Sequence, residues 1–218
     1  MSTWFATATE ARCSDAPETS PADLPAIEFS SPGCFAVRNP ASAALPAERW
    51  EPAPFRLGEH EPLERFEHPQ EARAHALALL QQARRSLCLH SPDLESWLYH
   101  HSSIQEACTR FLLANPRNRL RILVGDSAQA VRNGHRLINL SRRLSSNCLI
   151  RRLNPDYPKE DDAFLLADDQ GLLLRPKPAQ PAGYACYRAA GRVRQLQARF
   201  EQAWDTSLSD PDLRSFLL

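Results

Sequence analysis

The sequence is short of several features that would place it in a common protein class. Its six cysteines form no Cys-x-x-Cys pair, so their spacing favours neither a zinc site nor a thioredoxin-like redox motif. It has no apolar run of the roughly 18–20 residues that a membrane-spanning helix needs. It also has no charged and then apolar leader of the kind that marks a signal peptide. We therefore expect a cytoplasmic protein with reduced cysteines and no membrane span.

Lysine is scarce as well, and the charge is spread unevenly. Lys159 and Lys177 are the only lysines, so 24 of the 26 basic residues are arginines. Residues 1–70 hold eleven acidic residues and five arginines, a balance of −6, whereas residues 110–152 hold ten arginines and one aspartate, a balance of +9. Arginine suits bidentate recognition of carboxylate or phosphate, although exposed helix faces are charged in any case. The pattern leaves open both a basic binding face and an ordinary solvated surface.

Proline divides the chain into two parts. Residues 1–69 contain ten of the eighteen prolines, and proline interrupts helices and removes strand donors. We predict that 1–69 is a Pro-rich acidic arm, partly disordered, with spaced aromatic residues that strap 45–69 across a folded domain. That domain is expected to span residues 70–218.

From residue 70 apolar positions recur at helical or strand spacing. The predicted elements are helix 71–85, strand 86–90, a helix capped by Ser91 or Asp93 and running to 114, strand 120–125, a helix capped by Ser127 and running to 144, strands 148–153, 163–167, 172–175 and 184–187, and helix 190–205. Residues 168–171 are predicted to turn, with Gly171 accepting a positive φ. This order predicts an α/β fold with a mixed β-sheet flanked by helices, parallel where helices intervene and antiparallel at the hairpin.

Several local features carry a family resemblance. They are the run Ala83–Leu89 leading into Ser91-Pro92, the strand Leu120–Val124, the strand and turn Phe164–Asp169, and Phe200-x3-Trp204-x2-Ser207. Their order over 73–207 resembles one half of the phospholipase D-like fold. The segment is also similar to an uncharacterised bacterial domain, found in proteobacteria and sometimes beside GNAT-type acetyltransferase domains. No Gly-rich acetyl-CoA loop is present, so that activity is not expected here.

The resemblance implies a motif, His-x-Lys-(x)4-Asp, which this chain has lost. With Asp168 on the motif's Asp, the Lys position falls on Ala163 and the His position on Asp161. The family's reaction needs a His nucleophile and a Lys that holds phosphoryl oxygens, so we expect no enzyme activity. The aspartates around this strand have the oxygen ligands that Mg²⁺ or Ca²⁺ prefers. A strand start and a hairpin turn explain them without a metal, and we expect neither metal nor cofactor.

Other candidate site residues follow from position in the predicted fold. His90 ends a strand at the sheet edge where α/β ligand sites lie, whereas His101 falls in an apolar stripe and is expected to be a core histidine. The helix start after the strand 120–125 is a natural anion site. The residues predicted to bind an anion are Arg132, His135 and Arg136 beside this helix start, with Arg142 and Arg143 extending the basic surface. Aromatic residues are absent from this stretch, which disfavours base stacking but not contact with a phosphate backbone.

The leading hypothesis is a non-catalytic phospholipase D-like binding or regulatory module. One alternative is a polyanion- or nucleic-acid-binding protein that uses an Arg-rich face. The other is a protein-interaction accessory domain of an acetyltransferase-type system. The expected partner is therefore a protein or a polyanion, and the resemblance to halves that pair makes a homodimer a further expectation.

Overall fold

The computed structural model describes residues 49–158 and 162–214. All of them belong to one unit, Ala44–Leu218. Asp161 of the predicted motif, Lys159 and residues 1–48 of the predicted arm lie outside the described residues.

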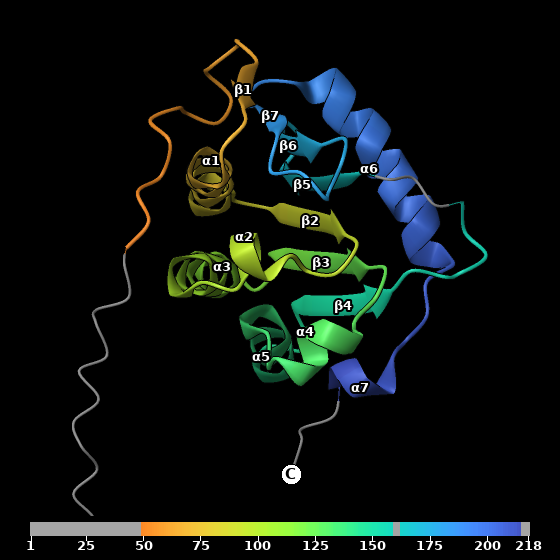
Figure 1. Ribbon diagram of the computed structural model, residues 1–218. Helices are drawn as coiled ribbons and strands as arrows, with labels where there is room; N and C mark the ends of the chain where they lie inside the picture. The colour runs from red at the N-terminus through yellow and green to blue at the C-terminus, as the bar shows by residue number, and fades with distance from the viewer. Residues whose placement is uncertain (1–48, 159–161, 215–218) are drawn as a thin grey trace, which may run out of the picture. The chain divides into compact units, whose positions relative to one another are not determined.

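The described strands form one mixed β-sheet of seven strands in the order β1-β7-β6-β5-β2-β3-β4 (Figure 1). The strands are β1 Glu64–Phe66, β2 Ser86–Ser91, β3 Arg119–Val124, β4 Cys148–Arg152, β5 Ala163–Ala167, β6 Gly171–Arg175 and β7 Gly183–Cys186. β2, β3 and β4 pair in parallel, and every other pairing is antiparallel. This confirms the predicted α/β fold with a mixed sheet.

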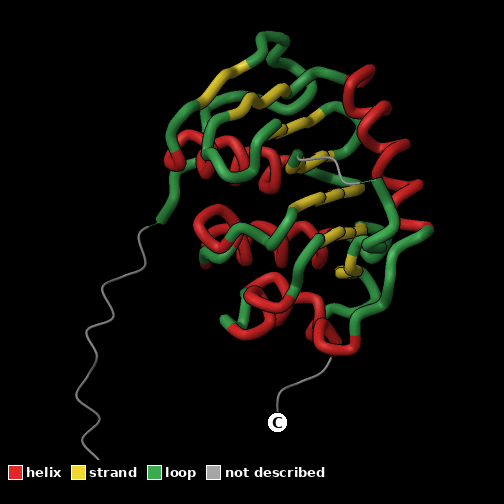
Figure 2. Tube along the Cα trace, turned by 45° about the vertical axis from the view of Figure 1, so that its right-hand side comes forward, coloured by secondary structure: helices red, strands yellow, loops and turns green. Residues whose placement is uncertain are grey.

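Helices cover both faces of the sheet. They are α1 Pro69–Gln82, α2 Ser96–Tyr99, α3 Ser102–Ala114, α4 Ala128–Arg132, α5 Arg136–Arg143, α6 Ala190–Asp205 and α7 Pro211–Arg214. α1, α3 and α5 lie on one face and α6 on the other, with the strands between them (Figures 1 and 2). None of the described helices combines the length and apolarity needed to cross a bilayer.

The two faces bury two separate clusters of apolar side chains, because successive residues of a strand point to opposite faces. In β2, Leu87 and Leu89 join the cluster under α1, α3 and α5, while Cys88 between them joins the cluster under α6. In β5, Leu165 packs on the first side and Phe164 on the second. Strands buried on both faces read as continuous apolar runs, as the predicted strand 163–167 does.

Residues 49–69 pack against the domain. Trp50, Phe55 and Leu57 contact the larger apolar cluster, and the Gln82 side chain bonds the segment by accepting from Leu57 N at 2.8 Å and donating to Phe55 O at 2.8 Å. β1 then pairs with β7 at the edge of the sheet. This part of the predicted arm therefore contributes a strand and core contacts to the fold.

The single helix predicted from 91 or 93 to 114 is wrong, because the chain forms two helices there. Leu94 and Glu95 have φ angles of 63° and 31°, which a right-handed helix cannot contain. α2 starts only at Ser96, and the chain leaves it before His101, whose backbone is extended. The His101 Nδ1 atom accepts from Ser103 N at 3.2 Å and so caps α3. His101 is half-buried and stacks on Trp50 with ring centroids 3.9 Å apart, so it is not the core histidine that was expected.

The helix predicted from Ser127 to 144 is also broken into two. α4 ends at Arg132, and Gly134 follows with a φ of 58°. His135 then caps α5, since its Nδ1 atom accepts from Leu137 N at 3.2 Å. A histidine is not among the usual N-cap residues, so the pattern does not predict the start of α5, whereas Asn133-Gly134 is a local signal for the end of α4.

The hairpin turn between β5 and β6 works differently from the prediction. Asp168, and not Gly171, has the positive φ, at 54°. Gly171 is required for space, because a Cβ atom there would lie 2.7 Å from Leu57 Cδ1 and 2.9 Å from Ala167 Cβ.

Candidate functional site

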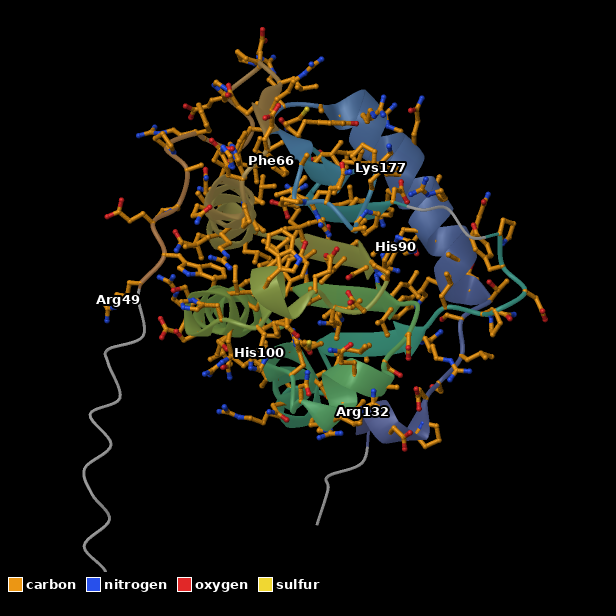
Figure 3. All side chains as sticks on the ribbon, viewed as in Figure 1. Arg49, Phe66, His90, His100, Arg132 and Lys177 are labelled. Carbon is orange, nitrogen blue, oxygen red and sulfur yellow. The ribbon has the colours of Figure 1, made fainter. Side chains whose placement is uncertain are left out.

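A cavity of about 780 Å³ opens at the carboxyl ends of the parallel strands β2, β3 and β4. Its lining residues are His90, Ser91, Pro92, Gly125, Asp126, Leu153, Asn154, Pro155, Asp162, Lys177, Pro178 and Ala179. They come from the ends of these strands, from the start of β5 and from the β6–β7 connection, and Figure 3 labels His90 and Lys177 among them. Ligands of open α/β sheets bind at this edge, so the cavity is the candidate functional site.

The loops after β2 and β3 are joined by backbone hydrogen bonds at the wall of the cavity. Gly125 N donates to Ser91 O at 3.1 Å, and Asp126 N donates to Pro92 O at 2.7 Å. A Cβ atom on Gly125 would lie 3.0 Å from Pro92 O, so glycine allows this close approach. Further along the loop after β2, Ser91 Oγ accepts from Leu94 N at 3.1 Å and supports the left-handed backbone. The wall is therefore held by backbone hydrogen bonds and by a glycine contact.

His90 is held at the cavity by a carbonyl group and an aromatic ring. Its Nδ1 atom lies 3.2 Å from Asp162 O, and the imidazole stacks on Phe164 with centroids 5.1 Å apart. A carbonyl oxygen only accepts, so Nδ1 carries the proton of this hydrogen bond. In the neutral ring Nε2 then holds the lone pair. The side chain of His90 is 15% exposed.

The carboxylate beside His90 is already balanced by an arginine. Asp162 Oδ1 lies 4.0 Å from His90 Nδ1, but both Asp162 oxygens accept from Arg199 Nη2, at 2.7 and 2.6 Å. The Arg199 guanidinium also lies over the Phe164 ring, 5.0 Å from its centroid. Asp162 therefore brings little net negative charge to the cavity.

A buried ion pair supports the loop that carries Lys177. Arg175 and Glu95 pair in the interior, where their side chains are 0% and 3% exposed. Arg175 Nη1 also donates to Pro178 O at 3.1 Å and to Gln180 O at 3.2 Å. Burial lowers the pKa of Arg175 to about 10. Sequence reasoning missed this pair, since the residues lie far apart in the chain and Arg175 ends an apolar strand.

The two residues of the predicted degenerate motif that the structure describes, Ala163 and Asp168, lie at opposite ends of β5. Ala163 begins the strand, next to the cavity residue Asp162, and its side chain is buried. Asp168 follows the strand at its far end, where its carboxylate accepts from Arg84 N at 2.9 Å, Arg85 N at 2.7 Å and Ser86 N at 3.0 Å. Asp168 therefore joins the β5–β6 turn to the start of β2 and does not line the cavity.

The predicted anion-binding residues are divided among several environments. Arg136 and Arg143 line one groove on the α3–α5 side. Arg142 reaches α7, donating to Asp212 O at 2.8 Å and Leu213 O at 3.3 Å. His135 is fully buried, and burial is the main cause that lowers its pKa to about 4. Arg132 is exposed at the end of α4 and lines none of these hollows. Across 49–158 and 162–214, no three histidine, cysteine or carboxylate side chains gather as a metal site would require.

Comparison with known proteins identifies the family. The family model described as a domain of unknown function, DUF7931, matches residues 68–216. The chain therefore belongs to the DUF7931 family. No curated protein sequence matches it.

Solved structures with similar folds include TrmBL2, an archaeal chromatin protein with a novel mode of DNA binding, at 13% identity and a TM-score of 0.52. That similarity covers 70% of this chain and 55% of TrmBL2, so the chain spans about half of that protein. Nuc from Salmonella typhimurium, a phospholipase D family member, has 12% identity and a TM-score of 0.48, covering 67% of this chain and 94% of Nuc. NucT from Helicobacter pylori has 9% identity and a TM-score of 0.49, covering 68% and 98%. At 13% identity the likeness to TrmBL2 concerns the fold alone and says nothing about activity.

Proposed function

We propose that this domain is a non-catalytic phospholipase D-like binding module, whose ligand enters the cavity at the carboxyl ends of β2, β3 and β4. The observation that carries the proposal is the cavity itself. Its volume of about 780 Å³ lies within the range typical of small-molecule sites. The cavity combines His90, which is fixed by its hydrogen bond to Asp162 O, with Lys177 and apolar walls. It lies at the edge of the sheet where α/β proteins bind ligands.

The lining favours a ligand with an apolar body and one anionic end. Leu153 and the prolines at 92, 155 and 178 supply apolar surface. Lys177 is exposed at the rim and brings a positive charge, while Arg199 balances Asp162. Asp126 is the remaining carboxylate of the lining, and its Oδ1 atom accepts from Ala128 N at 2.9 Å.

The degenerate motif supports the absence of catalysis. The resemblance places the family's phosphoryl-binding lysine at Ala163, an apolar side chain buried in the sheet. A phosphoryl-transfer site without that cation loses the stabilisation of charge that develops in the transition state. His90 and Lys177 are a histidine and a lysine that line the same cavity, so turnover that depends on them is the outcome an experiment has to exclude.

One probe tests both parts of the proposal. Bis-p-nitrophenyl phosphate carries two apolar rings and a phosphodiester anion, and its hydrolysis releases coloured nitrophenolate. We expect the full chain to bind it without releasing nitrophenolate. Lys177→Ala should weaken binding about tenfold, since a hydrogen bond to a charged group contributes about 1.5 kcal/mol. Arg194→Ala, an exposed cation outside the cavity, should bind as the wild type does.

Two results would contradict the proposal in different ways. Release of nitrophenolate that His90→Gln abolishes would make the domain an enzyme. Equal affinity of the wild type and Lys177→Ala would remove the cavity as the binding site. An accessory role beside an acetyltransferase domain, and a homodimer detectable by light scattering, stay predictions.

A further inference from the structure

A second hollow, separate from the cavity, lies on the face formed by α1, α3 and α5. It encloses about 680 Å³ and is lined by four arginines, Arg49, Arg110, Arg136 and Arg143. We call this hollow the arginine groove. Figure 3 labels Arg49 on this side of the domain, away from His90 and Lys177. Arg110 comes from α3, whereas Arg136 and Arg143 begin and end α5.

Within the part of the chain that the structure describes, no carboxylate forms an ion pair with the arginines of the arginine groove. All four arginines are exposed. Arg136 donates to the neutral Gln105 side chain at 3.1 Å. Glu106 is the one carboxylate among the residues that line the groove. Elsewhere in the domain arginines do form ion pairs with carboxylates, as Arg121 does with Glu201.

The spacing of the arginines suits a row of anions. Arg136 and Arg143 are seven residues apart on one helix, a rise of about 10.5 Å over two turns, so they point to the same side. Phosphates of one nucleic-acid strand repeat about every 3.4 Å along the duplex axis, so this distance spans about three of them. Exposed guanidinium groups on two packed helices and a neighbouring segment therefore offer contacts along a backbone, and not a closed pocket for one ion.

The aromatic residue of the groove favours contact with phosphates over contact with bases. Trp50 lines the groove, but His101 stacks on its ring at 3.9 Å and the Arg73 guanidinium lies 4.9 Å from its centroid. A ring engaged in this way is a poor platform for stacking an unpaired base, which is how many proteins hold single strands. We infer that the arginine groove binds the phosphodiester backbone of duplex nucleic acid without reading its sequence.

The test measures the affinity of the full chain for a fluorescein-labelled 30-base-pair DNA duplex by fluorescence anisotropy, at a series of salt concentrations. Four phosphate contacts predict a slope of log K against log[salt] of about −3.6, because each contact contributes about −0.9. Arg136→Gln/Arg143→Gln should reduce the slope to about −1.8. If the wild type and the double variant bind equally at 1 M salt, this difference in slope makes the variant bind about 60-fold more weakly at 0.1 M salt.

The matched control removes the same charge elsewhere. Arg132 and Arg194 are exposed and line no part of the groove, so Arg132→Gln/Arg194→Gln should keep a slope near −3.6. Arg110→Gln/Arg143→Gln repeats the test, in case the first pair does not fold. The inference is overturned by no binding at 50 mM salt, by a flat salt response, or by equal losses in groove and control variants. Equally tight binding of poly-L-glutamate would reassign the groove to an acidic protein partner and overturn the nucleic-acid assignment.

Discussion

The aspartate that the resemblance places in a catalytic motif is predicted to stabilise the fold instead. Asp168 accepts hydrogen bonds from the backbone N–H groups of Arg84, Arg85 and Ser86. Arg84 and Arg85 lie in the connection between α1 and β2, and Ser86 begins β2, so the Asp168 carboxylate ties this part of the chain to the β5–β6 hairpin. Asp168→Ala removes both carboxylate oxygens, which together accept from these three donors.

The size of the effect follows from the contacts. Hydrogen bonds to a charged acceptor contribute about 1.5–3 kcal/mol each when the groups are well buried. Asp168 is half-buried, so water replaces part of the loss and we take about 1 kcal/mol for each donor, or about 3 kcal/mol in all. Asp168 also has a positive φ, which aspartate and asparagine tolerate better than alanine. Asp168→Asn keeps one acceptor oxygen and this tolerance, so its expected loss is about 1–2 kcal/mol.

Urea unfolding followed by circular dichroism measures these differences as midpoint shifts at a constant m-value. The control is Asp169→Ala, because Asp169 is the exposed neighbour in the same turn and should change the free energy of unfolding by less than about 0.5 kcal/mol. A loss below about 1 kcal/mol for Asp168→Ala would contradict the structural role. If that variant instead lost affinity for bis-p-nitrophenyl phosphate at unchanged stability, Asp168 would belong to the site.

Local periodicity was sufficient for most of the secondary structure, because apolar spacing is a property of neighbouring residues. The strand Ala163–Ala167 and the helix Ala190–Asp205 have the predicted bounds. The starts of α3 and α5 were missed, since each has an unusual N-cap, His101 or His135. The left-handed pair Leu94 and Glu95 has local support, since Ser91 Oγ accepts from Leu94 N and Asp93 Oδ1 accepts from Glu95 N. The ion pair of Glu95 with Arg175 is a long-range contact that apolar periodicity does not show.

The candidate site was predicted in part. His90 was identified because the end of a parallel strand has a known place in an α/β sheet, and the cavity does include it. Lys177 lies in a connection without periodicity, and its approach to the cavity depends on Arg175 holding the Pro178 and Gln180 carbonyl groups. A contact of this kind depends on the folded structure, so the pattern of neighbouring residues in the sequence does not predict it.

The arginine groove shows the same limit on a surface. The sequence grouped arginines that are neighbours in the chain, whereas the fold groups them by the packing of α3 against α5. Arg136 and Arg143 were predicted, but Arg49 and Arg110 reach the groove from distant segments. Arg142, next to Arg143 in the chain, is directed to α7.

Two further predictions concern buried charged and titratable groups. Arg175→Met leaves the Glu95 carboxylate buried without its partner and should lower the free energy of unfolding, measured with urea, by about 3–5 kcal/mol. Glu95→Gln/Arg175→Met should recover part of that loss. A double variant no more stable than the single one would contradict this account. His135 concerns pH. Its folded pKa of about 4, lowered mainly by burial and also by His100 and Arg136, lies below the unfolded value of about 6.5. The unfolded chain therefore binds the proton first as the pH falls, and the protein should lose about 2 kcal/mol of stability between pH 7.5 and pH 5 through this residue. His135→Asn keeps an acceptor for Leu137 N and removes the titration, so urea unfolding at the two pH values should show a smaller difference. Burial also lowers the pKa values of His75 and His100, so these residues account for the pH dependence of stability that remains in the variant. An unchanged pH dependence in the variant would show that His135 is not the buried neutral group.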